Sequence, residues 1–266
     1  MVSRILMTTL IAMVSLSSYA AGTINVYGAG GPHHAFEEAA AAFMSLDENR
    51  DVKIDITYGP LKKWEECAKS ISKDCQQKGA DILWGTSEHV TFTLMDQFKN
   101  YGFNNKSTSA IYLRPAVIIV QKGNPKKIDS FSDLINRDDI NKVVVNTQTL
   151  NTLTSGTGIW EDIAGREGKL EDIQKFRKKI IYQGQGSGDA FKYFDKNYAD
   201  AWISWPEWYA SHSQKIDVVN IEPSRRIYRA ITITKRNNAS EETNRFYEYL
   251  ISGKANKIFE KYNLIR

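Results

Sequence analysis

Short β-type segments alternate with helical segments along almost the whole chain, and this alternation constrains the fold more than any other feature. "TINVYG", "VKIDITYG" and "ADILWGT" have the apolar and β-branched content of buried strands, and each ends at or beside a glycine. After the first of them, apolar residues form one helical stripe: Phe36, Ala39, Ala40, Phe43 and Met44. This alternation favours an α/β fold with mainly parallel sheets and helices on both faces.

The second half of the chain repeats the alternation. Strands are predicted for "KVVVN", "IIYQG", "ADAWISW" and "IDVVNI". Helices are predicted for "GTGIWEDIAGR", "LEDIQKFRKKI" and "GSGDAFKYFDK", and two further amphipathic helices, separated by Gly253, end the chain.

Two unusually long predicted strands indicate two lobes. "IYLRPAVIIVQKG" follows only three strand–helix units, and "YRAITITKR" precedes the last helices, which need a sheet to pack on. If both strands cross between the lobes, hinges lie near residues 113–118 and 226–231. We then expect a first lobe of residues 21–113 and 229–266, a second lobe of residues 114–228, and a cleft between them.

The N-terminus has the features of a secretory signal peptide over residues 1–20. One positive charge, Arg4, precedes the apolar run "ILMTTLIAMVSL", and small residues stand at Ser18 and Ala20. The apolar run is too short to span a membrane, and no cysteine near the expected cleavage point indicates a lipoprotein. We therefore expect a soluble periplasmic protein that begins near Ala21.

The charge of the chain argues against nucleic acid as a partner. The formal net charge is +4, and basic residues are mixed with acidic ones, as in "KLEDIQKFRKK". Such runs are typical of solvated helix faces rather than of a basic binding stripe.

Two cysteines, Cys67 and Cys75, stand eight residues apart. In an oxidising compartment they can close a short surface loop as a disulfide, which we favour over two unpaired thiols. We expect no metal site, because the cysteines and the histidines do not combine at any zinc-finger spacing: His33, His34, His89 and His212.

The segments that follow the predicted strands are small, glycine-bearing or hydroxyl-bearing. They read "AGGPHH", "PLKKW", "TSEH", "TQTLNTLTSGTG" and "QGSGD", and several lead directly into a helix. Any one Ser or Thr before a helix is most often a helix cap. Five such segments on converging strand ends instead favour an anion site, because free backbone amides and the positive end of a helix dipole attract negative charge.

Motifs of enzymes and cofactor sites are missing from the sequence. "GAGGPH" has His33 where a dinucleotide-binding loop needs its third glycine, and "TSGTG" lacks the lysine of a phosphate-binding loop. Ser87 and His89 are close in "GTSEH", but two residues in one segment do not make a catalytic triad. We expect no enzymatic activity and no cofactor.

Arg114 stands among apolar residues in "YLRPAV", at the expected hinge. It is either paired with an internal carboxylate or directed into the cleft toward a bound carboxylate, sulfate or phosphate. Arg229 in "YRA" is a weaker case of the same kind. Trp202 and Trp205 in "WISWPEW" are more typical of the core than of a stacking surface for a ligand.

Several motifs together resemble a known family. "QKGNPKKIDSFSDL" and "LTSGTGIWED" resemble class II periplasmic solute-binding proteins of ABC importers, in the sulfate and molybdate group. "YGAGGPH", "ADILWGTSE", "YLRPAVIIVQKGNP", "TSGTGIWEDIAGR", "ADAWISWPEW" and "IFEKYN" are similar, in register over about 240 residues, to the accessory colonisation factor (AcfC-like) family and its related periplasmic antigens.

The resemblance implies a two-lobe protein that closes on a small anion. Carried over motif by motif, it implies these ligand-binding residues: Gly30, Gly31, His33, Thr86, Ser87, Arg114, Thr154, Ser155, Gly156, Thr157 and Ser187. The first loop, "YGAGGPHH", departs from the pattern of sulfate-binding members. A dicarboxylate or a phosphorylated small acid therefore fits better than bare sulfate.

The resemblance also implies partners. It implies ABC-type uptake through a permease, a link to host colonisation, and a homodimer. The alternative is an adhesin, or a ligand sensor that serves a chemoreceptor and has no transport role. The sequence does not distinguish between these, and it does not name the anion.

Overall fold

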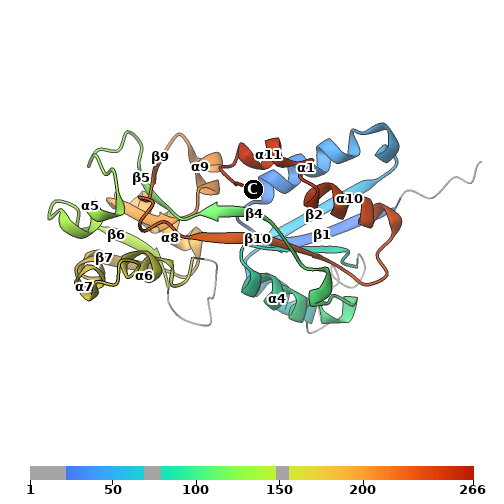
Figure 1. Ribbon diagram of the computed structural model, residues 1–266, viewed down its shortest axis with the longest axis horizontal. Helices are drawn as coiled ribbons and strands as arrows, with labels where there is room; N and C mark the ends of the chain where they lie inside the picture. The colour runs from blue at the N-terminus through green and yellow to red at the C-terminus, as the bar shows by residue number, and fades with distance from the viewer. Residues whose placement is uncertain (1–21, 69–78, 148–155) are drawn as a thin grey trace, which may run out of the picture.

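The computed structural model describes residues 22–68, 79–147 and 156–266, which form two five-stranded sheets lying side by side (Figure 1). The first sheet has the order β2-β1-β3-β10-β4, from Thr23–Ala29 (β1), Lys53–Gly59 (β2), Ile82–Gly85 (β3), Ser109–Pro115 (β4) and Tyr228–Lys235 (β10). The second has the order β7-β6-β8-β5-β9, from Val117–Gln121 (β5), Val143–Asn146 (β6), Ile180–Gly184 (β7), Ala201–Ser204 (β8) and Ile216–Asn220 (β9). Each sheet with its helices is called a lobe below, and the two-lobe α/β fold is as expected.

Helices cover both faces of each sheet. In the first lobe they are His33–Met44 (α1), Glu241–Ile251 (α10) and Asn256–Glu260 (α11) on one face, with Glu65–Ala68 (α2) and Glu88–Gln97 (α4) on the other. In the second lobe they are Phe131–Asn136 (α5), Ile159–Ala164 (α6) and Leu170–Lys179 (α7) on one face, with Ser187–Lys196 (α8) and Glu207–His212 (α9) on the other. Short 3-10 helices complete the described elements: Asp47–Asn49, Leu61–Trp64, Lys99–Tyr101 and Asn105–Ser107.

The core consists of four clusters, one on each face of each sheet. Strand β5 shows how the sequence produces this arrangement. Its residues Val117 and Ile119 pack against α8, while Ile118 and Val120 pack against α5 and α6, because successive strand side chains point to opposite faces. A run of consecutive apolar residues is therefore what a strand buried on both faces requires. Trp202 and Trp205 are buried, which confirms their predicted place in the core.

Each sheet is mainly parallel, as expected, with one reversed strand. Strands β1, β2 and β3 are mutually parallel where they pair, as are β6, β7 and β8. The antiparallel strands are β10, which pairs with β3 and β4, and β5, which pairs with β8 and β9. These two strands are reversed because β5 and β10 each begin where the chain arrives from the other lobe, so they run against their neighbours.

The first long predicted strand is two strands in the structure. It belongs to the first sheet as β4, changes sheets at Ala116, and continues in the second sheet as β5. The chain returns through residues 221–227, and β10 then pairs only within the first sheet. The two passages lie side by side, since the backbone N–H of Ala116 donates to the carbonyl of Ile227 at 2.9 Å.

Short helices account for most of the other differences from the predicted elements. The structure adds α5 and α9, each of six residues, because such short helices leave no apolar period to detect in the sequence. The segment after β2 begins as the 3-10 helix Leu61–Trp64 and continues as α2. Three predictions rest on residues outside the described ranges. They are the signal peptide, the disulfide that needs Cys75, and the ligand contacts of Thr154 and Ser155.

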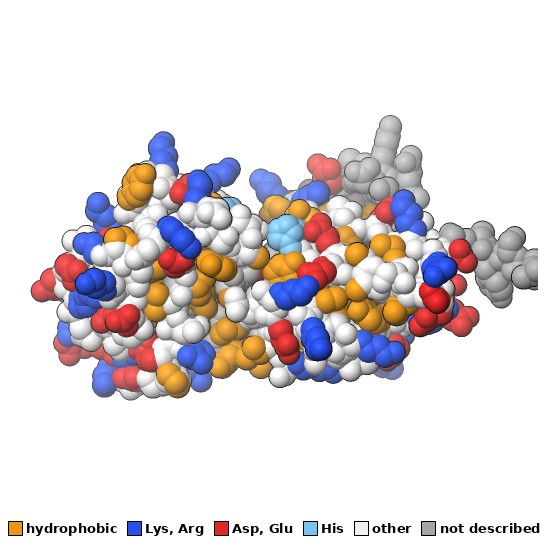
Figure 2. All heavy atoms as spheres, turned by 90° about the horizontal axis from the view of Figure 1, so that it is seen from above, with side chains coloured by type: hydrophobic (Ala, Val, Ile, Leu, Met, Phe, Trp, Pro, Cys, Tyr) orange, Lys and Arg blue, Asp and Glu red, His pale blue; other side chains and the backbone are white. Residues whose placement is uncertain are grey.

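The surface carries both signs of charge on both lobes, and its outline is indented between them (Figure 2). Among the described residues, no helix is long and apolar enough to cross a membrane.

Candidate functional site

The carboxyl ends of the parallel strands in the two lobes face each other. Strand β10 starts at the passage from the second lobe, and its antiparallel register places Thr232 opposite Gly85, the last residue of β3. Strand β5 starts at the passage from the first lobe, and its register places Val117 opposite Ser204, the last residue of β8. Open α/β sheets bind ligands at the carboxyl ends of their strands, so the junction between the lobes is the candidate site.

The first loop reaches the second lobe through Gly31. A Cβ atom at this position would lie 2.6 Å from Oε1 of Glu207 on α9, and 3.3 Å from Thr86. Only glycine therefore allows the loop to approach this closely. Gly30 is different, because a Cβ there would have no heavy atom within 4 Å, so open space lies beside it.

Arg114 joins the two lobes. Its side chain is 1% exposed, and its guanidinium donates from Nη1 to Oε1 of Glu207 and from Nη2 to the carbonyl of Thr86. The guanidinium carbon lies 4.3 Å from the ring centroid of Trp205. The sequence left two interpretations of Arg114, a pair with an internal carboxylate or a contact with a bound anion. The structure shows the internal pair, and its carboxylate belongs to the other lobe.

Burial and pairing act in opposite directions on Arg114. Burial lowers the pKa of Arg114 by disfavouring its charged form. The adjacent Glu207 carboxylate offsets part of this shift, so the net direction is downward. Two atoms of this pair, Nε of Arg114 and Oε2 of Glu207, are buried without a hydrogen-bond partner in the described part of the chain. The pair therefore has unused hydrogen-bonding capacity on both sides.

Thr86 and Ser87 lie where β3 leads into α4, and both are buried. Ser87 is the N-cap residue of α4, but its hydroxyl does not cap the helix. It lies instead 3.2 Å from Nδ1 of His89. The Ser87 side chain is therefore not a helix cap in this structure, and its hydroxyl remains a candidate ligand contact.

The second lobe contributes a polar group around Asn146, the last residue of β6. Its Nδ2 donates to Oγ of Ser187 at 3.0 Å, at the start of α8. A Cβ at Gly156 would lie 2.5 Å from the same Nδ2, so glycine is needed there for the chain to pass. Ser204 ends the neighbouring strand β8, and its hydroxyl is buried without a partner among the described residues. Thr157 follows Gly156 and is partly exposed just before α6.

His33 contacts its own lobe. Its Nδ1 lies 3.1 Å from the carbonyl oxygen of Gly30, and its ring stacks at 3.9 Å on Tyr58 at the end of β2. Burial lowers the pKa of His33, and the neighbouring His34 lowers it further. The ring is therefore held neutral near pH 7.

Two further pairs connect the lobes at the surface. Nε2 of His34 on α1 lies 3.0 Å from Oγ of Ser211 on α9, and Arg229 on β10 pairs with Asp162 on α6 at 2.6 Å. Arg229 thus lies in a partly exposed ion pair. Burial lowers the pKa of His89, and the positive charge of Arg229 lowers it further.

The structure groups the predicted residues into two sets. Gly31, Thr86 and Arg114 meet in the first lobe, and Gly156 and Ser187 meet at Asn146 in the second. The stretch from Ser204 to Glu207 connects the two sets. Four polar or aromatic members of the site were not predicted for it: Asn146, Ser204, Trp205 and Glu207.

The sequence carries a weak signal for two of these residues. Asn146 is the polar residue that ends the apolar run "KVVVN", and Glu207 is the one acid within "WISWPEW". A polar residue that ends or interrupts a strongly apolar segment is thus the pattern that could have indicated the site. The contact between Glu207 and Arg114, 93 residues apart, leaves no pattern in the sequence.

Chemically, the arrangement suits the binding of an anion. Hydroxyl groups, helix N-termini and a guanidinium are hydrogen-bond donors that suit oxyanions. Two Ser–His contacts are similar to a nucleophile and base. One is exposed and joins Ser211 to His34, whose Nδ1 lies 3.3 Å from Glu37, and the other joins Ser87 to His89. His89 has no carboxylate partner in the described residues to orient it, as a catalytic triad would require.

Comparison with known proteins agrees with this interpretation. The model of the family "Bacterial extracellular solute-binding protein" matches residues 24–263. Among curated proteins, the chain is 25% identical over 243 residues to the putative ABC transporter substrate-binding lipoprotein YvgL of Bacillus subtilis (strain 168), covering 90% of this chain and 85% of that protein.

Solved structures provide further matches. Peb3 from Campylobacter jejuni is 37% identical with a TM-score of 0.78, and the match covers 91% of this chain and 99% of that one. PEB3 bound to L-phospholactate is 36% identical with a TM-score of 0.79 and the same coverage. The sulfate-binding protein SubI from Mycobacterium tuberculosis H37Rv matches at 15% identity and a TM-score of 0.67, over 91% of this chain and 86% of that one, which shows a shared fold alone.

Proposed function

Because the chain belongs to the family of bacterial extracellular solute-binding proteins, we propose that it binds a small anion between its two lobes. The observation that carries this proposal is the junction itself, where the carboxyl ends of both sets of parallel strands face each other across Arg114 and Glu207. Binding takes place in the periplasm, involves no covalent step, and delivers the anion to an ABC-type permease.

The lobes open and close around the ligand, and the hinges of this motion are the two passages between them, at residues 113–118 and 226–231. Bending there separates Arg114 from Glu207, because the two residues belong to different lobes. Opening thus releases a guanidinium that Glu207 neutralises while the lobes are in contact. An incoming acid can then take the position of Glu207 at Arg114, and its remaining oxygens can bind the hydroxyl groups of Ser87, Thr157 and Ser187.

The ligand class is a small organic acid with a second acidic group, such as a dicarboxylate or a phosphorylated three-carbon acid. The open space beside Gly30 suits an anion larger than sulfate. The structure of PEB3, which is 36% identical to this chain, contains L-phospholactate, and this makes a phosphorylated acid the first compound to test.

Further parts of the hypothesis concern the biological setting. The resemblance to AcfC-like proteins supports a link to host colonisation. The same resemblance implies a homodimer, and a chemoreceptor in place of the permease is the alternative hypothesis. The disulfide between Cys67 and Cys75 is a prediction from the residues themselves. The transport role and the sensor role use the same ligand-bound form and differ only in the protein that recognises it.

Calorimetric titration of the mature protein tests the proposal. L-phospholactate, malate, phosphate and sulfate are titrated separately in a buffer that contains EDTA. We expect binding of at least one organic acid, and a loss of about fivefold in affinity for Ser187→Ala, because one hydrogen bond contributes about 1 kcal/mol.

Ser252→Ala is the matched control, because Ser252 is exposed in the first lobe and its hydroxyl donates to the carbonyl of Tyr249, one turn earlier in the chain. Its affinity should equal that of the unmodified protein. An absence of binding for all four anions would refute the anion proposal. Equal affinity of Ser187→Ala and Ser252→Ala would remove Ser187 from the site.

A further inference from the structure

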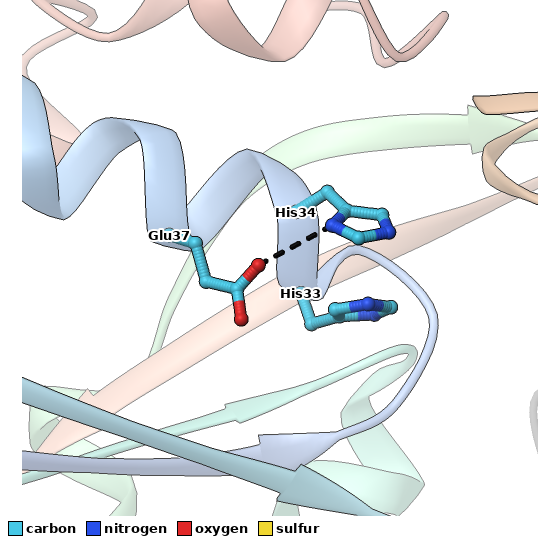
Figure 3. Close-up of side chains that lie close together, drawn as sticks. All are labelled: His33, His34 and Glu37. Carbon is cyan, nitrogen blue, oxygen red and sulfur yellow. Dashed lines mark hydrogen bonds and ion pairs between the residues drawn. The ribbon is translucent and has the colours of Figure 1, made fainter. Parts of the chain in front are cut away.

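We propose that His33, His34 and Glu37, at the start of α1, form a binding site for a divalent transition-metal ion of the zinc class. One ligand atom from each of the three side chains lies within 4.8 Å of the other two. Figure 3 shows the two imidazole rings one above the other, with the carboxylate of Glu37 directed toward His34. The site lies at the exposed edge of the junction between the lobes, where His34 contacts Ser211 of the second lobe, and it is additional to the proposed anion binding.

The distance between His34 and Glu37 already suits a shared ion. Nδ1 of His34 lies 3.3 Å from Oε2 of Glu37. Two ligand atoms that bind one tetrahedral Zn²⁺ at the usual bond lengths are also about 3.3 Å apart. An ion can therefore replace the proton between these two atoms, and His33 offers the third ligand atom within 4.8 Å of both side chains.

The second nitrogen of each imidazole has a partner of the kind that metal-binding histidines use. Nδ1 of His33 lies 3.1 Å from the carbonyl oxygen of Gly30, so this nitrogen carries the proton and Nε2 has the lone pair for a metal. Nε2 of His34 lies 3.0 Å from Oγ of Ser211, which can accept its N–H when Nδ1 binds the ion. Such contacts fix the tautomer and the orientation of metal-binding histidines.

The surroundings select the class of ion. The start of α1 is the positive end of a helix dipole, which disfavours a hard cation held by charge alone. Imidazole nitrogen suits zinc and its neighbours, whereas Mg²⁺ and Ca²⁺ prefer sites composed of oxygen ligands. Two histidines and one glutamate leave a fourth position open in a tetrahedral site. The side chains of His34 and Glu37 are 43% and 45% exposed, so an ion can reach them from solvent.

The proposed site replaces the expectation of no metal site, which rested only on the zinc-finger spacings of cysteine and histidine. His33, His34 and Glu37 follow a different spacing, in which the first and last residues are one helical turn apart. Such residues lie on the same face of a helix. Adjacent His33 and His34 approach each other as well, with ring centroids 3.9 Å apart.

The test is a calorimetric titration of the mature protein, without any histidine tag, with ZnCl₂ in a phosphate-free buffer. We expect one equivalent of Zn²⁺ to bind, and no binding of CaCl₂. The substitutions His34→Asn and Glu37→Gln should each weaken Zn²⁺ binding at least about tenfold, and Ser211→Ala should weaken it less. His212→Asn is the matched control, because it removes a histidine outside the cluster and should leave the Zn²⁺ affinity unchanged.

Three results would overturn the proposal. They are no Zn²⁺ uptake by the unmodified protein, equal affinities for His34→Asn and His212→Asn, or equal affinities for Glu37→Gln and the unmodified protein. X-ray absorption at the zinc edge provides a readout that needs no variant, since it should show two imidazole ligands, and a spectrum without them refutes the site. Anion affinity measured in EDTA tests the proposed function independently.

Discussion

Two buried arginines of this protein have opposite surroundings. Arg225, in the segment that precedes β10, faces three carboxylates: Glu167 at 3.0 Å, Asp172, and Glu222 at 3.6 Å. It also donates to the carbonyl of Ala164 at 2.8 Å. Arg114 faces a single carboxylate, that of Glu207, and this partner belongs to the other lobe.

The difference separates a structural role from a functional one. All partners of Arg225 belong to the second lobe, so relative motion of the lobes leaves its contacts intact. The contact of Arg114 with Glu207 must break when the lobes separate, and the contact with Thr86 remains. A buried cation with several fixed carboxylates stabilises one lobe, whereas a buried cation with one separable carboxylate can exchange it for a ligand. Three substitutions test this comparison.

The largest effect is expected for Arg225→Met. Removing the guanidinium leaves Asp172 and Glu222 without their countercharge and Glu167 with Lys169 alone, which should lower the free energy of unfolding by about 3 kcal/mol. Urea denaturation followed by circular dichroism measures this loss. Arg166→Met, at an exposed arginine of the same lobe, should have little effect. Equal stabilities of the two variants would contradict the structural role of Arg225.

An intermediate effect is expected for Glu207→Gln. A neutral amide in place of the carboxylate cannot neutralise Arg114, so the guanidinium should bind an anionic ligand about tenfold more tightly, as expected for a charge-assisted hydrogen bond that no longer has an internal competitor. Calorimetric titration measures the affinity. Glu222→Gln is the matched control, since it removes a carboxylate at Arg225 and should leave the affinity unchanged. Weaker binding by Glu207→Gln than by the control would show that Glu207 contacts the ligand rather than competes with it.

The smallest effect is expected for Arg229→Gln, at the exposed ion pair with Asp162. Because burial is the larger cause of the lowered pKa of His89, removing the charge of Arg229 should raise this pKa only part of the way toward 6.5. A titration of the His89 ring by NMR measures the change, and the His212 ring serves as the control. An unchanged pKa of His89 would show that Arg229 does not act on it.

The same shift determines the sign of a pH dependence. The folded protein holds His89 less protonated than the unfolded chain, so the unfolded state binds more protons as the pH falls below about 6.5. The stability contributed by neutral His89 is therefore complete above that pH and is lost as the pH falls through the lowered pKa. Arg229→Gln should narrow the pH range over which this stability is lost, because it moves the pKa of folded His89 closer to 6.5. Thermal melts between pH 5 and pH 7 measure this change.

Much of the fold could be predicted because it depends on local patterns. Strands such as β1 and β6 and helices such as α1 and α10 follow from apolar periodicity, which reflects the burial of one or both faces. The sequence did not indicate which strand of each sheet is reversed. Strands β5 and β10 run against their neighbours because of where the chain crosses between the lobes, and no residue within either strand encodes that crossing.

The site could be predicted in part for the same reason. Residues after strands, such as Gly31, Ser87 and Ser187, could be proposed as ligand contacts because strand ends and helix starts are local features. The choice between the two interpretations of Arg114 needed the position of Glu207. Likewise, His33, His34 and Glu37 are close in sequence, but the contacts that orient the two imidazoles include Ser211, which is 177 residues from His34.

The sequence by itself determined the α/β class, the two lobes and the small polar segments at the strand ends, because each depends on residues within one helix or strand length. Only the tertiary structure decided which charges are paired, which glycines allow close contact, and which hydroxyl groups of the described residues have no partner. Those properties depend on contacts between residues that are distant in the chain. Long-range packing alone brings a carboxylate of one lobe to an arginine of the other.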